Sequence, residues 1–196
     1  MTRAEIMGQA LRCLDEIYPE DNSANTLNFP LEEFADEAAR RVLLAAPLHA
    51  VPCVSDFSGA GITAREDGSG EIALPDDFLR LARLRMEGWK RPVTVLIPEE
   101  SAAYPKQFHP ATRGGCAKPA AVLVRGGKAL EYFSVTGTPR IAEALYIPFS
   151  GIGEEYPDKL GGATAWMLAA LVLSVSNDPP GAKEAEARAG ELLSLL

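Results

Sequence analysis

The chain has 196 residues, of which 47% are hydrophobic and 23% are charged, and its formal net charge is −8. These proportions are typical of a globular protein and argue against a largely disordered chain. Because an acidic surface repels phosphate, the charge disfavours nucleic-acid binding across the whole protein but leaves a local basic patch open.

The cysteines and the N-terminal residues indicate a soluble protein with reduced thiols. The chain has three cysteines, an odd number, and they are widely spaced at Cys13, Cys53 and Cys116. This arrangement does not suit a disulfide framework. Met1 is followed by polar and charged residues, so we expect no signal peptide. The longest apolar run, 163–175, is too short to span a bilayer comfortably, so we expect no membrane contact.

Two amphipathic helices are predicted near the N-terminus. From Arg3 to Tyr18, apolar residues recur every three or four positions, and Pro19 ends the helix. This first stripe comprises Ile6, Ala10, Leu14 and Ile17, with Cys13 beside them. The second helix begins with Pro30 at its first position, has Glu32 and Glu33 in the first turn, and ends before Pro47. Its stripe is Leu31, Phe34, Ala38, Val42 and Ala45.

The middle of the chain, about residues 51–147, has the patterns of β-strands. Residues 62–66 and 71–74 flank the turn sequence Asp67-Gly68-Ser69-Gly70, which indicates a hairpin. A second hairpin is predicted from residues 121–125 and 128–133 around Gly126-Gly127. Further strands are expected at residues 79–86, 93–97 and 141–147.

Residues 99–119 form a long loop between these strands. The segment holds three prolines and two adjacent glycines, and we expect one short helical turn within it. A loop of this length in a compact domain is usually functional, so we interpret it as a docking arm that orders on assembly.

Two more helices are predicted at the C-terminal end. Pro157 and Asp158 open a helix that reaches about Asn177, and Asp178-Pro179-Pro180 ends it and starts the next. In the last helix one face carries Ala182, Ala185, Ala189, Leu192 and Leu196. The run 163–175 is apolar nearly all round, so its helix must be surrounded on several sides. We favour a central core helix over an oligomer interface.

These patterns predict an α+β fold. The N-terminal helical part (residues 1–50) and the C-terminal helical part (residues 151–196) pack as a bundle, and an antiparallel β lobe (residues 51–150) is inserted between them.

The sequence offers little for catalysis, for a cofactor or for a metal. Gly59-Ala60-Gly61-Ile62-Thr63-Ala64 fits a loose dinucleotide pattern, but a strand is predicted where that pattern needs a helix. His49 with Cys53, and His109 with Cys116, lack the further ligands of a structural zinc site. No serine lies in a nucleophile elbow, and we interpret adjacent acids such as Glu99-Glu100 as solvated surface charge.

The segment Leu74-Pro75-Asp76-Asp77-Phe78-Leu79-Arg80-Leu81 follows the first hairpin, the β part ends in Leu145-Tyr146-Ile147-Pro148, and two helices close the chain. This arrangement resembles the head-to-tail connector (adaptor) proteins of tailed bacteriophages, including the tubular-tail adaptors of short-tailed phages and the ring proteins of crAss-like phages. In that family an LP-x-D-F-L-R-L stretch often opens a strand.

The resemblance implies a non-enzymatic virion protein. Its subunits would form a ring, commonly twelve-fold, which joins the portal protein to tail proteins and lets DNA pass through the lumen without sequence readout. It implies a place at the head–tail interface of the virion and, during assembly, in the host cytoplasm. No catalytic residue carries over from the family, and the chain ends directly after its final helix, without the docking tail of some members.

We therefore expect subunit interfaces rather than an active site. Arginine is enriched at interfaces, and exposed apolar residues form adhesive patches. The candidate interface residues are Arg83, Arg85, Tyr104, Phe108, Trp166, Leu192 and Leu196. The alternative is a small-ligand-binding or hydrolytic module, which would need a concave site with convergent acids in the β lobe.

Overall fold

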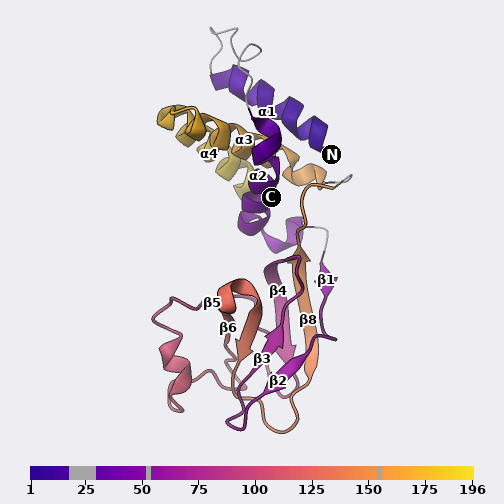
Figure 1. Ribbon diagram of the computed structural model, residues 1–196, viewed down its shortest axis with the longest axis vertical. Coiled ribbons are helices and arrows are strands. Elements are labelled where there is room, and N and C mark those ends of the chain that lie inside the picture. Colours follow the sequence, from indigo (N-terminus) through magenta and orange to yellow (C-terminus); the bar gives the residue numbers. More distant parts are fainter. Residues whose placement is uncertain (18–29, 52–53, 154–155) are drawn as a thin grey trace. The chain divides into compact units, whose positions relative to one another are not determined.

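The computed structural model describes residues 1–17, 30–51, 54–153 and 156–196 (Figure 1). The fold class is α+β, as predicted, with helices from both ends of the chain packed together. The chain divides into two compact units. The helical unit comprises Met1–Pro52 and Phe149–Leu196, and the β unit comprises Cys53–Pro148. The predicted helix end at Tyr18 and Pro19, and Cys53, lie outside the described residues.

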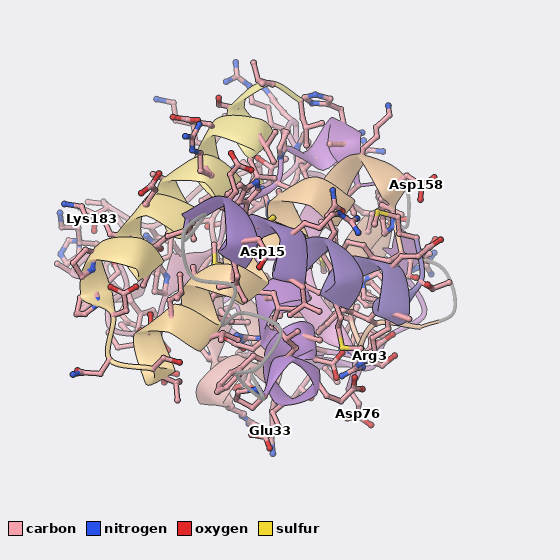
Figure 2. All side chains as sticks on the ribbon, turned by 90° about the horizontal axis from the view of Figure 1, so that it is seen from above. Arg3, Asp15, Glu33, Asp76, Asp158 and Lys183 are labelled. Carbon is pink, nitrogen blue, oxygen red and sulfur yellow. The ribbon has the colours of Figure 1, made fainter. Side chains whose placement is uncertain are left out.

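Four α-helices make up the helical unit. They are α1 (Arg3–Ile17), α2 (Leu31–Ala45), α3 (Asp158–Val175) and α4 (Pro179–Ser194), with a short 3-10 helix at Leu48–Ala50. Helix α3 contacts α1, α2 and α4, so it lies at the centre of the bundle. Charged side chains such as Glu33, Asp158 and Lys183 point outward from these helices (Figure 2).

Helix α3 is buried on all sides because its sequence has no polar face. Leu160, Ala165, Leu168 and Val172 are fully buried, which confirms the interpretation of this segment as the core helix. Its one buried hydroxyl, that of Thr164, bonds within the helix to the Leu160 carbonyl at 2.9 Å.

The N-terminal helices follow their predicted stripes with two corrections. Pro30 is the N-cap of α2 and not its first helical residue; its carbonyl accepts the Glu33 N–H at 3.2 Å. Ala45, predicted in the stripe, is exposed. The stripe continues at the buried Ala46 instead, which lies four residues after Val42.

Helix α4 begins at the predicted break. The Asp178 carboxylate accepts the Gly181 N–H at 3.2 Å, and prolines occupy the first helical positions, where their missing N–H has no consequence. Ala182, Ala185 and Ala189 are buried as expected. The predicted face does not stay buried to the end, because Leu192 is 37% exposed.

The β unit contains two sheets. The first has the order β1 (Ser55–Asp56), β8 (Ile141–Pro148) and β4 (Phe78–Met86), all antiparallel. The second has the order β2 (Ile62–Ala64), β3 (Gly70–Ala73), β7 (Ala129–Tyr132), β6 (Ala121–Val124) and β5 (Ile97–Pro98). Residues of both sheets, including Ile72, Leu84, Leu130 and Tyr146, share one core cluster.

Both predicted hairpins form. Strands β2 and β3 pair antiparallel across a turn in which Gly68 has a φ of 80°, a conformation that glycine adopts without strain. Strands β6 and β7 pair across Arg125–Gly127. Gly70 is needed for a different reason: a Cβ there would lie 2.5 Å from the Thr63 carbonyl oxygen and closer still to the Tyr132 hydroxyl.

The prediction of a strand at residues 93–97 was wrong in the extent of the strand and in its pairing. Val93 makes only an isolated bridge to Leu84, and the strand β5 is confined to Ile97–Pro98. It pairs parallel with β6, so the lobe is not purely antiparallel. The intervening Val95 is 80% exposed, and a chain that changes direction here cannot continue a β ladder.

The Leu74–Leu81 segment forms a turn and then opens β4, the longest strand of the described chain. The Phe78 N–H bonds to the Pro75 carbonyl at 3.1 Å. The Phe78 ring stacks on Tyr146 with centroids 5.7 Å apart, and the Tyr146 hydroxyl donates to Asp77 at 2.9 Å. This segment therefore joins β4 to β8 through an aromatic contact and a hydrogen bond.

Candidate interaction surfaces

A buried carboxylate lies on the five-stranded sheet. Glu131 of β7 is 2% exposed and forms an ion pair with Arg65. Its other oxygen accepts the Tyr104 hydroxyl at 2.7 Å. Arg65 also bonds Glu71 at 2.6 Å, and Arg125 pairs with Glu71 at 2.8 Å. Every partner that a buried carboxylate requires is therefore supplied by neighbouring side chains.

The electrostatics of this cluster favour a structural role. The hydrogen bond to Glu131 raises the pKa of the Arg65 guanidinium. Burial, assisted by the hydrogen bond to Glu131, raises the pKa of Tyr104 to about 12. Tyr104 thus stays protonated near neutral pH and acts as a hydrogen-bond donor to Glu131 rather than as a group that transfers a proton.

A second anchor holds the long loop at Arg113. Its guanidinium donates to the Gln107 carbonyl at 2.9 Å and to the Asp67 carboxylate at 2.8 Å. It also lies over the Phe133 ring, 5.9 Å from the centroid. Hydrogen bonds from Ser69, and then from Arg113, lower the pKa of Asp67 to about 2. The loop 99–119 is therefore tied to the first hairpin as well as to the sheet, unlike the free arm that we predicted.

Phe108 projects from this anchored loop. It ends the 3-10 turn Pro105–Phe108, where one short helical turn was expected. Its ring lies 5.0 Å from Tyr104 and 6.4 Å from Phe133, yet 55% of the residue is exposed. We call this feature the aromatic knob: Phe108, supported underneath by Tyr104 and Phe133. Of the predicted interface residues, Tyr104 and Phe108 are thus brought together.

Arg83 and Arg85 share one exposed face of β4, as their alternation predicts. Both face Glu143 of β8, at 3.2 Å for Arg83 and 4.0 Å for Arg85. About half of each arginine side chain is solvent-accessible. This face therefore presents two accessible guanidinium groups beside the Glu143 carboxylate.

The remaining predicted interface residues lie in the helical unit. Trp166 is half-buried on α3, and Leu192 is partly exposed on α4. The Leu196 backbone oxygen lies 2.7 Å from Nε2 of His49, which fastens the end of the chain to the 3-10 turn after α2. The neighbouring Leu195 is 82% exposed. The leucine-rich end of the chain therefore presents apolar surface in the isolated chain.

A shallow open groove of about 400 Å³ lies in the β unit. It is lined by Asp56, Phe57, Gly59, Ala60, Gly61, Ala73, Leu74 and Pro75. Among the described residues that line the groove, Asp56 is the only charged one, and Phe57, Leu74 and Pro75 give the groove an apolar floor. The Asp56 carboxylate accepts the Ser58 N–H at 2.6 Å, and that bond lowers the pKa of Asp56. The carboxylate stays ionised and does not face a second acid in the groove lining.

The loose dinucleotide segment contributes two glycines to this groove. It leads into β2, a strand, so the helix N-terminus that would bind a phosphate does not follow it. Gly59 and Gly61 are exposed, and a Cβ at either position would meet no atom within 4 Å.

Sequence reasoning missed the buried Glu131 and the two arginines, Arg65 and Arg113, that anchor this part of the β unit. Glu131 is the one charged residue in the apolar run Ala-Leu-Glu-Tyr-Phe, and this exception to the strand pattern was the available signal. Arg65 and Arg113 carried no such signal, because their partners lie far away in sequence.

In residues 1–17, 30–51, 54–153 and 156–196, no three His, Cys, Asp or Glu side chains gather where they could hold a metal ion. In the same part of the chain, α3 alone has the length and composition of a membrane span, with a mean hydropathy of 1.2. Because 61% of that window is buried by the protein, α3 fits a core helix better.

Comparison of the sequence with models of known protein families found no match, and a search among curated proteins found none either.

Proposed function

We propose that this chain is a structural virion protein, a subunit of a head-to-tail connector ring that joins portal to tail around the DNA channel of a tailed bacteriophage. The observation that carries the proposal is the position of the Leu74–Leu81 segment. It opens the longest strand of a β unit that is inserted between N- and C-terminal helices. That is the order of elements which the resemblance to connector proteins implies.

The distribution of polar and apolar groups supports an assembly role. The buried Glu131 carboxylate is fully paired, whereas Phe108 and Leu195 expose large apolar surfaces. Exposed apolar side chains of this kind are favourable when a neighbouring subunit covers them. The net charge of −8 suits a channel wall along which DNA slides, because it repels the phosphate backbone.

The groove favours one alternative, a small-ligand-binding or hydrolytic module. Its volume lies within the range of ligand sites, and its floor is apolar. Its lining holds a single carboxylate, however, and general acid–base hydrolysis requires a second group in reach. We therefore place this function second.

The test is co-expression of the full chain with the portal protein encoded nearest to it, followed by affinity purification through the portal. We expect electron micrographs of the portal particle to show an added ring of this chain. A chain that never co-purifies with portal or tail proteins, and remains a monomer that hydrolyses a small substrate, would refute the proposal.

A charge-reversal pair makes this test sharper. If the Arg83/Arg85 face contacts a neighbour, then the double variant R83E/R85E reduces incorporation into the ring. The matched control R40E/R41E changes the net charge equally on exposed side chains of α2, which pair with Glu37. If both double variants were incorporated equally, Arg83 and Arg85 would not belong to the subunit interface.

A further inference from the structure

The β unit has a projecting aromatic residue on one flank and an apolar groove on another. The aromatic knob belongs to the loop that extends beyond β5 and β6, whereas the groove is built by the chain from β1 to β2 and by the end of β3 (Figure 1). The loop and β1 lie at opposite sides of the β unit (Figure 1). One molecule therefore cannot place its own knob in its own groove.

The two surfaces match in shape and polarity. A groove of about 400 Å³ accommodates one phenyl ring, and its floor of Phe57, Leu74 and Pro75 offers apolar contact. Burial of an aromatic side chain removes about 150–250 Å² from water, which makes such residues frequent anchors of interfaces. The Phe108 ring also packs against the rings of Tyr104 and Phe133, and this contact restricts its rotamers before docking and so reduces the side-chain entropy that docking costs.

The charges match as well. Asp56 is the charged residue among the described residues that line the groove, and it is exposed and ionised. Lys106, two residues before Phe108, is exposed and forms no ion pair among the described residues. Opposite charges beside an apolar contact fix its register and accelerate association.

We propose that Phe108 of one copy inserts into the groove lined by Asp56, Phe57 and Gly61 of a second copy, with Lys106 facing Asp56. Because the two surfaces are different and lie on opposite flanks, the contact is head-to-tail. Such contacts propagate from subunit to subunit and close into a ring when the rotation permits. This inference rests on the proposed function, because it names the neighbour that a connector ring requires.

Complementary variants test the contact in the full chain. F108A removes the knob and leaves the groove. G61W fills the groove from a position where an added Cβ meets no atom within 4 Å, and leaves the knob. V95A is the matched control, since Val95 is an exposed apolar residue outside both surfaces. Circular dichroism and thermal unfolding verify that each variant is folded.

Sedimentation velocity and native mass spectrometry give the readout. We expect F108A and G61W each to weaken self-association about tenfold or more, and V95A to leave it unchanged. An equimolar mixture of F108A and G61W should form one-to-one dimers, because the intact knob of G61W fits the intact groove of F108A. A folded mixture without dimers, or F108A that associates like the wild type, overturns the contact.

A photo-crosslinker gives an independent readout. With p-benzoylphenylalanine at position 108, the cross-linked peptide should come from the groove segments 54–61 or 73–75 of another copy. A wild-type chain that is monomeric at every concentration and yields no such cross-link overturns the inference. If F108A and G61W form portal-bound rings as well as the wild type does, the proposed contact is overturned and the connector function is not. If the wild type fails to bind the portal, the connector function itself is overturned.

Discussion

The Tyr104 hydroxyl donates a hydrogen bond of 2.7 Å to the buried carboxylate of Glu131. This bond joins the loop 99–119 to the central strand of the five-stranded sheet. It also places the Tyr104 ring beneath Phe108, with centroids 5.0 Å apart. The position of the exposed Phe108 therefore depends on Tyr104, which is held by the partly buried hydrogen bond to Glu131.

Replacement of Tyr104 by phenylalanine tests this dependence. Y104F keeps the ring but leaves one oxygen of Glu131 without its donor, so we expect the free energy of unfolding to fall by about 1–2 kcal/mol. Denaturant unfolding measures the loss, and amide hydrogen exchange should show faster exchange in the loop. Unchanged stability and exchange in Y104F would mean that the hydrogen bond does not hold the loop.

A Cβ at position 70 should disturb the first hairpin. The backbone of Thr63 and the ring of Tyr132 leave no room for it, so G70A is expected to destabilise the β unit by about 1–3 kcal/mol. The matched control is G59A, whose added methyl group meets no atom within 4 Å. If thermal unfolding gave the same midpoint for both variants, the close approach at Gly70 would be refuted.

The Asp67 carboxylate should make stability depend on acid pH. Its pKa falls from 3.8 to about 2 in the folded chain, chiefly through hydrogen bonds from Ser69. Because this pKa is lower in the folded chain than in the unfolded chain, the ionised carboxylate stabilises the fold. The stabilisation is fully present above pH 3.8 and is lost as the pH falls toward 2. Because half of the Asp67 side chain is exposed, we expect it to contribute less than about 1 kcal/mol to the free energy of unfolding.

The variant D67N isolates this contribution. Asparagine can still accept the Ser69 hydrogen bonds but carries no charge toward Arg113. The difference in free energy of unfolding between wild type and D67N should narrow as the pH is lowered through the interval between the two pKa values. If this difference stayed constant across that pH interval, Asp67 would not be the source of the pH-dependent stability.

Truncation of Leu168 tests the position of α3 as the core helix. Leu168 is fully buried, so L168A should lower the free energy of unfolding by about 2–5 kcal/mol. The control L195A removes a side chain that is 82% exposed and should change the stability little. Equal, small effects in the monomer would indicate that α3 is covered by a neighbour rather than by α1, α2 and α4.

The cysteines should differ in reactivity. Burial raises the pKa of Cys13 to about 11, so its reactive thiolate is scarce at neutral pH and its access is restricted. Cys116 is only partly buried. Thiol labelling of the native chain, read by peptide mass spectrometry, should modify Cys116 well before Cys13. Equal rates at the two positions would contradict the burial of Cys13.

The local pattern of residues was sufficient for the elements themselves. Apolar spacing placed α1, α2 and α3 almost at their observed limits, because a helix buries one stripe or, in α3, every face. Turn residues placed both hairpins, since Gly68, Gly126 and Gly127 adopt positive φ angles, which glycine tolerates without strain. The α+β class followed from the order of these elements along the chain.

Only the tertiary structure decided how distant residues meet. Glu131 lies 66 residues from Arg65 and 27 from Tyr104, and no local spacing encodes those contacts. The parallel pairing of β5 with β6 also needs a long crossover, which periodicity cannot specify. The groove and the knob are surfaces assembled from separate segments, so they exist only after the strands have paired. Local conformational preferences act between near neighbours in sequence, whereas burial and ion pairing act between neighbours in space.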